Sequence, residues 1–397
     1  MKKITRAFIC WAGLAVNGSY AAVDHHPTDV KADIKQAVTA FMRANDVPGV
    51  AVEIYVDGKP QSYYFGLADK VKKTPVTKNT IFEVGSITKV MTSLLLAQQV
   101  DSARMQLDNS VIDYIPDLPA QYEDITLVNL ATHTAGLPFD VPDNISATAA
   151  MHDYLNKWSP TFSPDEQWVY SNIGMGMLGI AIEKMTHLTL EQLYQRQIQT
   201  PLKMTSLALV EPAKNKKWLA TGYNAEGNPV KPMTPDLLPA AAGLKISAED
   251  MKRFLSAAIG LPGTPENILY PMRMTQASYV KLADRKQGLG WQIHSLRADK
   301  VPALLDKSED VHLGPLPINE LYERPKFNGN SLIDKTGLTN GFSAYMAVIP
   351  NKRAGIVIMA NKRMTKAALV VIGREILFKM ANVTSAVKSV SEVAHEG

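Results

Sequence analysis

Two nearly continuous apolar runs near the C-terminus constrain the fold of this chain more than any other feature. Residues 342–349 and 355–359 are almost entirely hydrophobic, and Pro350-Asn351-Lys352-Arg353 separates them. A strand with one solvated face alternates apolar and polar side chains, whereas a strand buried on both faces reads as a continuous apolar run. The two runs therefore predict a β-hairpin inside a sheet that is covered on both faces.

Both ends of the chain supply elements to this sheet. Apolar residues at helical spacing predict a helix over 29–44, and alternation over 50–56 predicts a strand. Asp57-Gly58 is typical of a tight turn, so the chain is expected to return as a second strand over 61–67. Later elements that we expect are strands at 289–293 and 331–334 and a closing helix at 365–380.

The middle of the chain has a different character. Helical patterns occur at 91–100, 127–133, 172–185 and 189–198, with Pro and Gly between them. A linker between independent domains is disfavoured, because the first two strands alone could not form a stable sheet. We therefore expect an α/β (α+β type) sheet domain from residues 22–80 and 244–397, a helical domain from residues 81–243 inserted into it, and the active site between them. Pro-rich residues 299–324 are expected to form a long surface excursion.

The first 21 residues have the features of a secretory signal. Lys2, Lys3 and Arg6 precede a short apolar stretch, and Ser19-Tyr20-Ala21 offers small residues for cleavage after Ala21. The stretch is too short for a spanning helix, which disfavours a membrane anchor. We expect export to the periplasm or the medium as a soluble monomer. Cleavage would also remove Cys10, the only cysteine, and with it any thiol or disulfide chemistry.

Composition excludes several function classes. The chain of 397 residues has 42 basic and 38 acidic residues, which is too balanced for a typical nucleic-acid binder. Hydrophobic residues at 46% and charged residues at 20% are ordinary for a globular protein with a large core. The 8 histidines are scattered without metal-ligand spacing, so we expect neither a metal nor a cofactor. Among them, His133 is expected to order the turn at Gly136 rather than to catalyse.

The segment Ser86-Ile87-Thr88-Lys89 carries the first chemical signal. A serine three residues before a lysine on the first helical turn shares its face, so the amine can reach the hydroxyl. The positive end of the helix dipole stabilises an alkoxide and disfavours an ammonium ion, which suits a nucleophile and its base. The pattern alone is common, and an ordinary serine at a helix N-terminus is the alternative.

Two further triplets complete the pattern. In Tyr170-Ser171-Asn172, the tyrosine is a candidate to share proton transfer with a lysine. The asparagine is a candidate to hold Lys89 and to hydrogen-bond a substrate amide. Lys335-Thr336-Gly337 stands at the end of a predicted strand. There the lysine adds positive charge, the threonine hydroxyl can bind a carboxylate, and the glycine lets a substrate approach the strand edge.

The order and spacing of the three motifs resemble those of serine β-lactamases and penicillin-binding proteins. A triplet that begins with tyrosine, and the loop at 163–167 before it, are similar to those of the class C enzymes. Other segments similar to class C enzymes are 130–138, 201–203, 287–291 and 335–362. The resemblance covers essentially the whole chain after the signal segment.

The resemblance implies an antiparallel sheet flanked by helices with an inserted helical domain, and a serine hydrolase that opens β-lactam rings. It implies that Ser86 forms an acyl-enzyme, that Lys89 and Tyr170 move the protons, and that no metal or cofactor takes part. Further implied contacts with the substrate are the backbone N–H groups of Ser86 and Leu338 for the oxyanion, Asn172 and Asp140 for the side-chain amide, and Lys335, Thr336 and Gly337 for the carboxylate end.

Four positions depart from the class C pattern. Asp140 stands where many class C enzymes have glutamine, and Ala242 where they have tyrosine before a glycine. Lys366 and Leu369 align with an asparagine and an arginine that lie near the substrate carboxylate in the family. We expect these changes to alter substrate preference and to leave the chemistry intact.

Three alternatives remain. A D-alanyl-D-alanine carboxypeptidase on the same scaffold would keep its acyl-enzyme with a β-lactam instead of turning it over. An esterase is disfavoured because its relatives often lack the lysine found at position 335. A non-catalytic β-lactam sensor is disfavoured because no spanning helix follows the signal segment and Ser86, Lys89, Tyr170 and Lys335 are all present.

Overall fold

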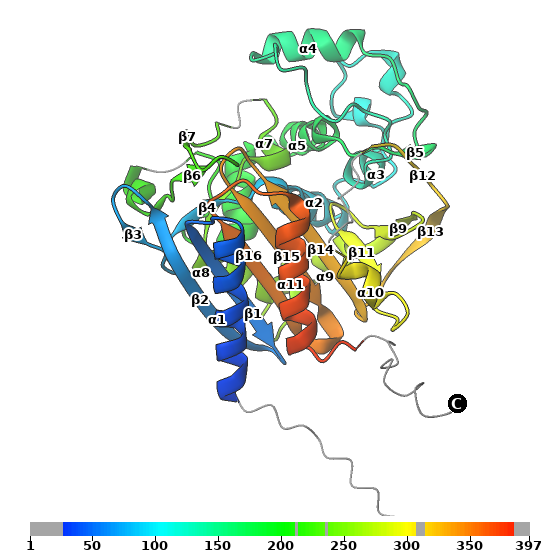
Figure 1. Cartoon of the computed structure of the whole chain (residues 1–397). Coiled ribbons are helices and arrows are strands. Elements are labelled where there is room, and N and C mark those ends of the chain that lie inside the picture. Colours follow the sequence, from blue (N-terminus) through cyan, green and yellow to red (C-terminus); the bar gives the residue numbers. More distant parts are fainter. Residues whose placement is uncertain (1–26, 211–212, 235–236, 307–313, 385–397) are drawn as a thin grey trace, which may run out of the picture.

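A ten-stranded sheet forms the centre of the computed structural model, which describes residues 27–210, 213–234, 237–306 and 314–384 (Figure 1). The expected signal segment lies outside the described residues. Every pair of neighbouring strands in the sheet runs antiparallel. In spatial order the strands are β13 (Glu320–Phe327), β9 (Ala277–Lys281), β10 (Lys286–Gln287), β11 (Gln292–Ser295), β14 (Ser331–Leu338), β15 (Ser343–Ile349), β16 (Ala354–Ala360), β1 (Gly49–Val56), β2 (Lys59–Asp69) and β3 (Thr74–Pro75).

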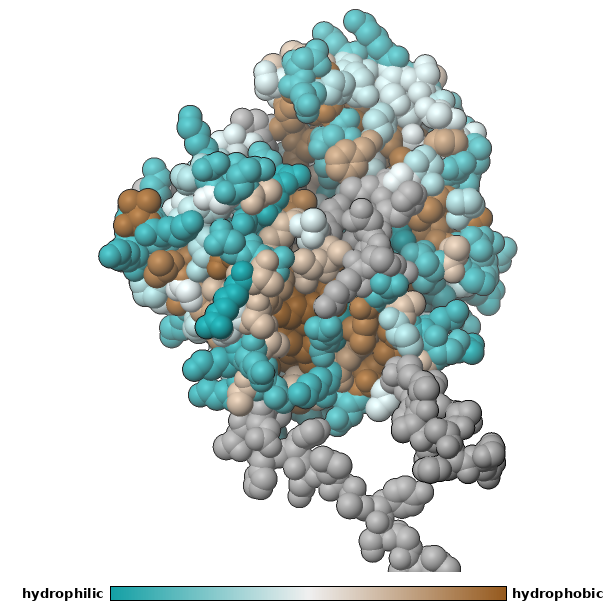
Figure 2. Space-filling view, in the orientation of Figure 1, coloured by the Kyte–Doolittle hydropathy of each residue, from teal (hydrophilic) through white to brown (hydrophobic). Residues whose placement is uncertain are grey.

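Helices cover both faces of this sheet, as the continuous apolar runs predict. α1 (Pro27–Ala44) and α11 (Lys366–Met380) lie across one face (Figure 1). α8 (Ala248–Ile259) packs on the other face, against β1, β15 and β16, and α9 (Glu266–Thr275) packs on α8. In the orientation of Figure 2, hydrophobic side chains appear among hydrophilic ones on the face that carries α1 and α11.

Alternate residues of the central strands serve two separate apolar cores. On β1, Val50, Val52 and Ile54 belong to the core beneath α1 and α11. Ala51 and Tyr55, at odd-numbered positions of the same strand, belong to the larger core that includes α8 and the helices beyond it. Because side chains alternate along a strand, one sheet can close both cores.

Helices dominate the described residues between β3 and β8 (Figure 1). The α-helices of this part are α2 (Thr88–Asp101), α3 (Leu127–Thr132), α4 (Thr148–Lys157), α5 (Asn172–Thr186), α6 (Leu190–Tyr194) and α7 (Pro239–Ala242). Short turns of helix are η1 (Gly85–Ile87), η2 (Val111–Asp113), η3 (Ala120–Tyr122), η4 (Gln195–Gln199) and η5 (Ala213–Trp218). Paired short strands are β4 (Ile81–Glu83) with β8 (Lys245–Ser247), β5 (Gln167–Trp168) with β12 (Leu316–Pro317), and β6 (Gly222–Tyr223) with β7 (Pro229–Val230).

The predicted fold class is confirmed, with corrections to individual elements. The C-terminal hairpin is present as β15 and β16, joined by η6 (Pro350–Lys352). Residues 299–324 are not a simple surface excursion, because they contain α10 (Val301–Leu304), β12 and the first part of β13, which is an edge strand of the main sheet. Among the described residues, no helix is long and apolar enough to cross a membrane.

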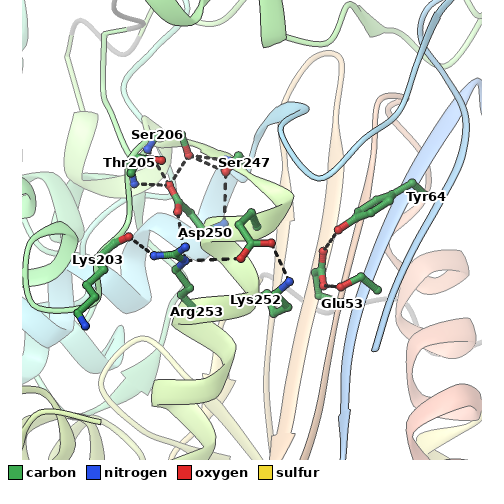
Figure 3. Close-up of polar contacts among 11 residues, drawn as sticks. Glu53, Tyr64, Lys203, Thr205, Ser206, Ser247, Asp250, Lys252 and Arg253 are labelled. Carbon is green, nitrogen blue, oxygen red and sulfur yellow. Dashed lines mark hydrogen bonds and ion pairs between the residues drawn. The ribbon is translucent and has the colours of Figure 1, made fainter. Parts of the chain in front are cut away.

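The start of α8 is fastened to the segment that follows η4 (Figure 3). Ser247 caps the helix by accepting a hydrogen bond from the backbone N–H of Asp250. The Asp250 carboxylate is 1% exposed and accepts from the backbone N–H groups of Thr205 and Ser206, each at 2.7 Å, and from the Ser206 hydroxyl at 2.6 Å. One carboxylate therefore satisfies three donors in the part of the chain that precedes the sheet strand β8.

We predict that Asp250→Ala lowers the free energy of unfolding by about 3 kcal/mol, because it leaves buried donors without an acceptor. Glu249→Ala is the matched control, since Glu249 lies on the same turn of α8 but forms a partly exposed ion pair with Lys252. The control should cost less than about 1 kcal/mol. Urea unfolding of both variants measures the difference, and equal losses would contradict the role given to Asp250.

Candidate active site

The candidate nucleophile, Ser86, lies in the tight turn η1 that leads directly into α2. The turn depends on Gly85, whose φ is +51°, a conformation that side chains disfavour. An ideal Cβ on Gly85 would also lie only 2.5 Å from the backbone nitrogen of Leu338. Ser86 itself is half-buried, so its hydroxyl stands at the positive end of α2 and within reach of a ligand.

Lys89 is fully buried one turn further along and directs its amine to three acceptors. Its Nζ lies 3.2 Å from Ser86 Oγ, 2.7 Å from Asn172 Oδ1 and 2.9 Å from the carbonyl oxygen of Ala241. Burial lowers the pKa of Lys89 to about 8, and the nearby charge of Lys335 acts in the same direction. The structure therefore brings a serine hydroxyl next to an amine that has lost part of its preference for the charged form.

Tyr170 lies between two buried lysines. Its ring is 5% exposed and immediately precedes Ser171, the N-cap of α5. Lys335 Nζ donates a hydrogen bond to the Tyr170 hydroxyl at 3.1 Å. The amines of Lys335 and Lys89 lie 4.6 Å and 5.0 Å from the centre of the ring, within the range of cation–π attraction. The phenol is thereby held in contact with both lysine amines.

Lys335 lies within β14, whereas we expected it just past the end of a strand. The lysine is 3% exposed, and burial lowers its pKa to about 7, with Arg285 acting in the same direction and Asp334 opposing it. Pairing with β11 covers β14 only as far as Asp334. From Lys335 to Leu338 the strand pairs with β15 alone, so its other edge is free to face η1.

Gly337 allows this free edge to approach the nucleophile turn. An ideal Cβ on Gly337 would lie 1.9 Å from the carbonyl oxygen of Val84 and 3.3 Å from the backbone nitrogen of Ser86. Thr336, beside it, is half-buried. The backbone around Leu338 is thus brought next to the backbone of η1, and any side chain at position 337 would separate them.

Asn172 and Asp140 lie together on another side of Lys89. Asn172 Nδ2 donates to Asp140 Oδ2 at 2.7 Å, and Asp140 Oδ1 accepts from the backbone N–H of Val141. The Asp140 carboxylate therefore orients the asparagine amide so that Oδ1 faces Lys89. A cavity of about 300 Å³ lies against both residues, and Leu238 and Ala242 also line it.

Two residues near Tyr170 contribute in ways that the sequence analysis missed. His133 ends α3 in a left-handed conformation, and its ring stacks on Tyr170 with centroids 4.3 Å apart, so it does not serve only the turn at Gly136. Its Nδ1 accepts from the backbone N–H of Ser171 at 3.3 Å, and burial lowers the pKa of His133 well below its usual value. Arg285 packs over Trp168, whose ring meets that of His133 edge to face, with centroids 5.9 Å apart. His133 lies in the segment 130–138 that resembles class C enzymes, but the segment does not show its contact with Tyr170, and no motif indicates Arg285.

The remaining departures from the class C pattern lie in different places. Ala242 lines the cavity beside Asn172. Leu369 is 2% exposed and packs into the core beneath α1 and α11, so it is not a surface that a substrate touches. The side chain of Lys366 lies outside the described residues. Within the described part of the chain, no group of three or more metal-binding side chains occurs.

Comparison with known proteins identifies the family. The Beta-lactamase family model matches residues 34–377. The chain belongs to the β-lactamase family. It is 32% identical over 334 residues to a β-lactamase of Yersinia enterocolitica, covering 83% of this chain and 86% of the relative. It is 32% identical over 355 residues to a β-lactamase of Escherichia coli (strain K12), covering 88% of this chain and 94% of that relative.

Solved structures show which class of β-lactamase this chain resembles. A class C β-lactamase in complex with cefoxitin matches with a TM-score of 0.83 and 32% identity, covering 89% of this chain and 99% of that one. A protein of Pseudomonas syringae named as a β-lactamase and D-alanine carboxypeptidase matches with a TM-score of 0.83 and 30% identity. The match covers 88% of this chain and 98% of that one. The predicted membership of the class C serine β-lactamases is confirmed.

We predict that Gly337→Ala lowers the kcat/KM of this β-lactamase about 100-fold or more, since a shift of about 1 Å at a reacting centre can cost that much. The added methyl group would overlap the backbone of Val84 and push β14 away from η1. Gly174→Ala is the matched control, because a Cβ there meets only ordinary contacts at 3.5 Å or more. Steady-state kinetics with a chromogenic cephalosporin measures both, and full activity in Gly337→Ala would show that the close approach is unnecessary.

Proposed function

We propose that this class C β-lactamase hydrolyses the amide of a β-lactam ring through an acyl-enzyme on Ser86. The observation that carries the proposal is the 3.2 Å contact between Lys89 Nζ and Ser86 Oγ. With a pKa of about 8, a useful fraction of Lys89 is the neutral amine near neutral pH, and its lone pair can then accept the hydroxyl proton.

Acylation requires a proton to leave Ser86 and a proton to reach the ring nitrogen. Ser86 Oγ forms a bond with the carbonyl carbon as its proton passes to Lys89 or Tyr170. When the tetrahedral intermediate collapses, the carbon–nitrogen bond breaks and the nitrogen takes a proton from the same pair. The backbone N–H groups of Ser86 and Leu338 would stabilise the oxyanion between η1 and β14.

Deacylation repeats these transfers with water as the nucleophile. The Tyr170 hydroxyl, held by Lys335, would take a proton from the attacking water as its own proton passes to the neutral amine of Lys89. The hydroxyl oxygen bonds to the ester carbon, the bond to Ser86 Oγ breaks, and Ser86 recovers a proton through Lys89. The open-ring acid then leaves with both elements of water added across the former amide.

Substrate binding would use groups on both sides of the nucleophile. Lys335 and Thr336 would bind the carboxylate that penicillins and cephalosporins carry, and Gly337 would let the ligand lie along β14. Asn172 and Asp140 would meet the side-chain amide. The cavity of about 300 Å³ beside these two residues would accept the variable side chain.

Ser86→Ala should abolish turnover and covalent labelling. Mass spectrometry of the wild-type protein with a slowly hydrolysed β-lactam should show one adduct, on the peptide that contains Ser86. The variant should show none, because alanine has no nucleophilic oxygen. An adduct on another peptide, or turnover by the variant, would refute the proposed mechanism.

The same preparation distinguishes the competing activity. The relative from Pseudomonas syringae is named for both β-lactamase and D-alanine carboxypeptidase activity. A protein that is chiefly a carboxypeptidase would form the Ser86 adduct and release it slowly, with little steady-state hydrolysis of a chromogenic cephalosporin. Rapid turnover of the cephalosporin favours the β-lactamase.

Asp140 should set a preference against anionic substrate side chains. A carboxylate accepts hydrogen bonds but donates none, and it repels a second carboxylate by about 1 kcal/mol in a partly solvated cleft. Asp140→Gln should therefore raise kcat/KM for penicillins with an anionic side chain about fivefold relative to neutral ones. The gain should shrink at high salt, because the charges are screened.

Asp143→Asn provides the matched control for this substitution. Asp143 is exposed on the same loop and does not line the cavity, so neutralising it changes the net charge of the protein equally. The selectivity ratio should stay flat in this control. An unchanged ratio in Asp140→Gln would remove Asp140 from substrate selection without affecting the role of Ser86.

We further propose that residues 1–21 direct export and are removed after Ala21, and that the protein acts as a monomer in the periplasm or the medium. We also propose that the exported chain has two domains. The sheet domain comprises residues 22–80 and 244–397, and the helical domain comprises residues 81–243. The positive and apolar residues of the segment support export.

A further inference from the structure

A buried carboxylate lies directly behind Lys335. Asp334 precedes Lys335 on β14, so the two side chains point to opposite faces of the sheet. Lys335 lies on the face of the nucleophile, whereas Asp334 lies on the face covered by α11 and is only 1% exposed. The proposed mechanism gives Asp334 no task.

Three elements supply partners to this carboxylate. Arg374 of α11 donates to Asp334 Oδ2 from Nη2 at 2.8 Å and from Nε at 3.2 Å. Tyr345 of β15 donates to the same oxygen at 2.7 Å. His294 of β11 places Nε2 3.2 Å from Oδ1. Arg374 also donates to the carbonyl oxygen of Leu304 at 3.0 Å, so the pair connects β14 to α11 and to the end of α10.

Stability alone is a weak reason for such a pair. Moving two charges out of water is costly, and well-packed apolar residues of similar size are often equally stable. Arg374 is 7% exposed, so solvent offers neither charge much compensation. A buried ion pair at this position therefore points to a task beyond holding the sheet to α11.

The charge of Asp334 has a direct consequence for Lys335. Among the described residues, no carboxylate forms an ion pair with Lys335, and its hydrogen-bond partner is the Tyr170 hydroxyl. Burial and Arg285 both favour the neutral amine, and Asp334 is the charge that opposes them, leaving the pKa of Lys335 at about 7. Without Asp334, the ammonium form would be lost at lower pH.

We propose that Asp334, held by Arg374, is a positioning residue that fixes β14 behind Lys335 and supplies the negative charge that keeps this lysine an ammonium ion beside Tyr170. The inference rests on the proposed function in giving Lys335 a task in the reaction. The groups that face the two residues are Tyr170, Lys89, His133 and Arg285 around Lys335, and Arg374, His294 and Tyr345 around Asp334.

Asp334→Asn tests the charge while keeping the shape. We expect the alkaline limb of the kcat/KM profile to move to lower pH by about one unit, because loss of a nearby opposite charge favours the neutral amine. The variant should thus lose about tenfold more activity above this limb than below it. A contact that only stabilises the fold would lower activity equally at every pH.

A second variant guards against misfolding, since Asp334→Asn leaves a buried guanidinium without its carboxylate. Asp334→Leu with Arg374→Met removes both charges and replaces them with apolar side chains, which often preserves stability. The double variant should shift the alkaline limb in the same direction but by less, because the Arg374 cation is removed together with the carboxylate, and its Tm should stay close to that of the wild type.

Glu53→Gln is the matched control. Glu53 is a fully buried carboxyl group on β1 of the same sheet, accepts hydrogen bonds from Ser62 and Tyr64 (Figure 3), and has its pKa raised by burial to about 7, so it titrates in the same range as Lys335. β15 and β16 separate β1 from β14. Neutralising Glu53 should therefore leave the alkaline limb where it is, even where it changes stability.

A direct titration separates this inference from the proposed function. The ¹³Cε resonance of Lys335 in lysine-labelled protein, assigned by its loss in Lys335→Arg, should titrate at lower pH in Asp334→Asn and in the double variant. Unchanged titration in folded variants would overturn the inference, whatever the activity. Failure of Ser86 to become acylated would instead remove the proposed function and leave the titration result standing.

Discussion

The burial of two lysine amines on either side of one tyrosine is the constraint on which the site depends. Lys89 arrives from the first turn of α2 and Lys335 from β14, and both are almost completely removed from solvent. Water would otherwise keep each amine charged and Tyr170 hydrogen-bonded to solvent. The sheet and the helices beside it must therefore close tightly, and Gly85 and Gly337 are the positions where side chains would prevent this closure.

Tight packing around the buried amines is accompanied by short polar contacts at the first turns of two helices, α5 and α8. Asp250 satisfies three donors at the start of α8, and Asn172 bridges Lys89 and Asp140 at the start of α5. Asp250 and Asn172 both lie in the first turn of a helix, and each holds a loop to that helix through its side chain: Asp250 holds the loop at Thr205 and Ser206, and Asn172 holds the loop at Asp140.

The sequence predicted those parts of the protein that repeat a pattern. Continuous apolar runs predicted β15 and β16, and the order of three motifs predicted Ser86, Tyr170 and Lys335 as neighbours. Edge strands escaped prediction, because β13 carries exposed polar residues and Pro325 and resembles a loop. Arg285 and Asp334 also escaped, and for His133 only a role in the turn at Gly136 was predicted, since each acts through contacts with distant elements that spacing along the chain does not show.

Each of the two buried amines is also influenced by a carboxylate with which it forms no direct hydrogen bond. Asp140 reaches Lys89 through the amide of Asn172, and its charge favours the ammonium form of that lysine. Asp334 acts on Lys335 from the opposite face of β14. Neither carboxylate hydrogen-bonds to its lysine directly, so each adjusts the charge of the amine from a distance. Asp334 does so from the face of β14 that α11 covers, whereas Asp140 also lines the cavity beside Asn172. One carboxylate therefore serves the charge of its lysine alone, and the other serves both that charge and the choice of substrate.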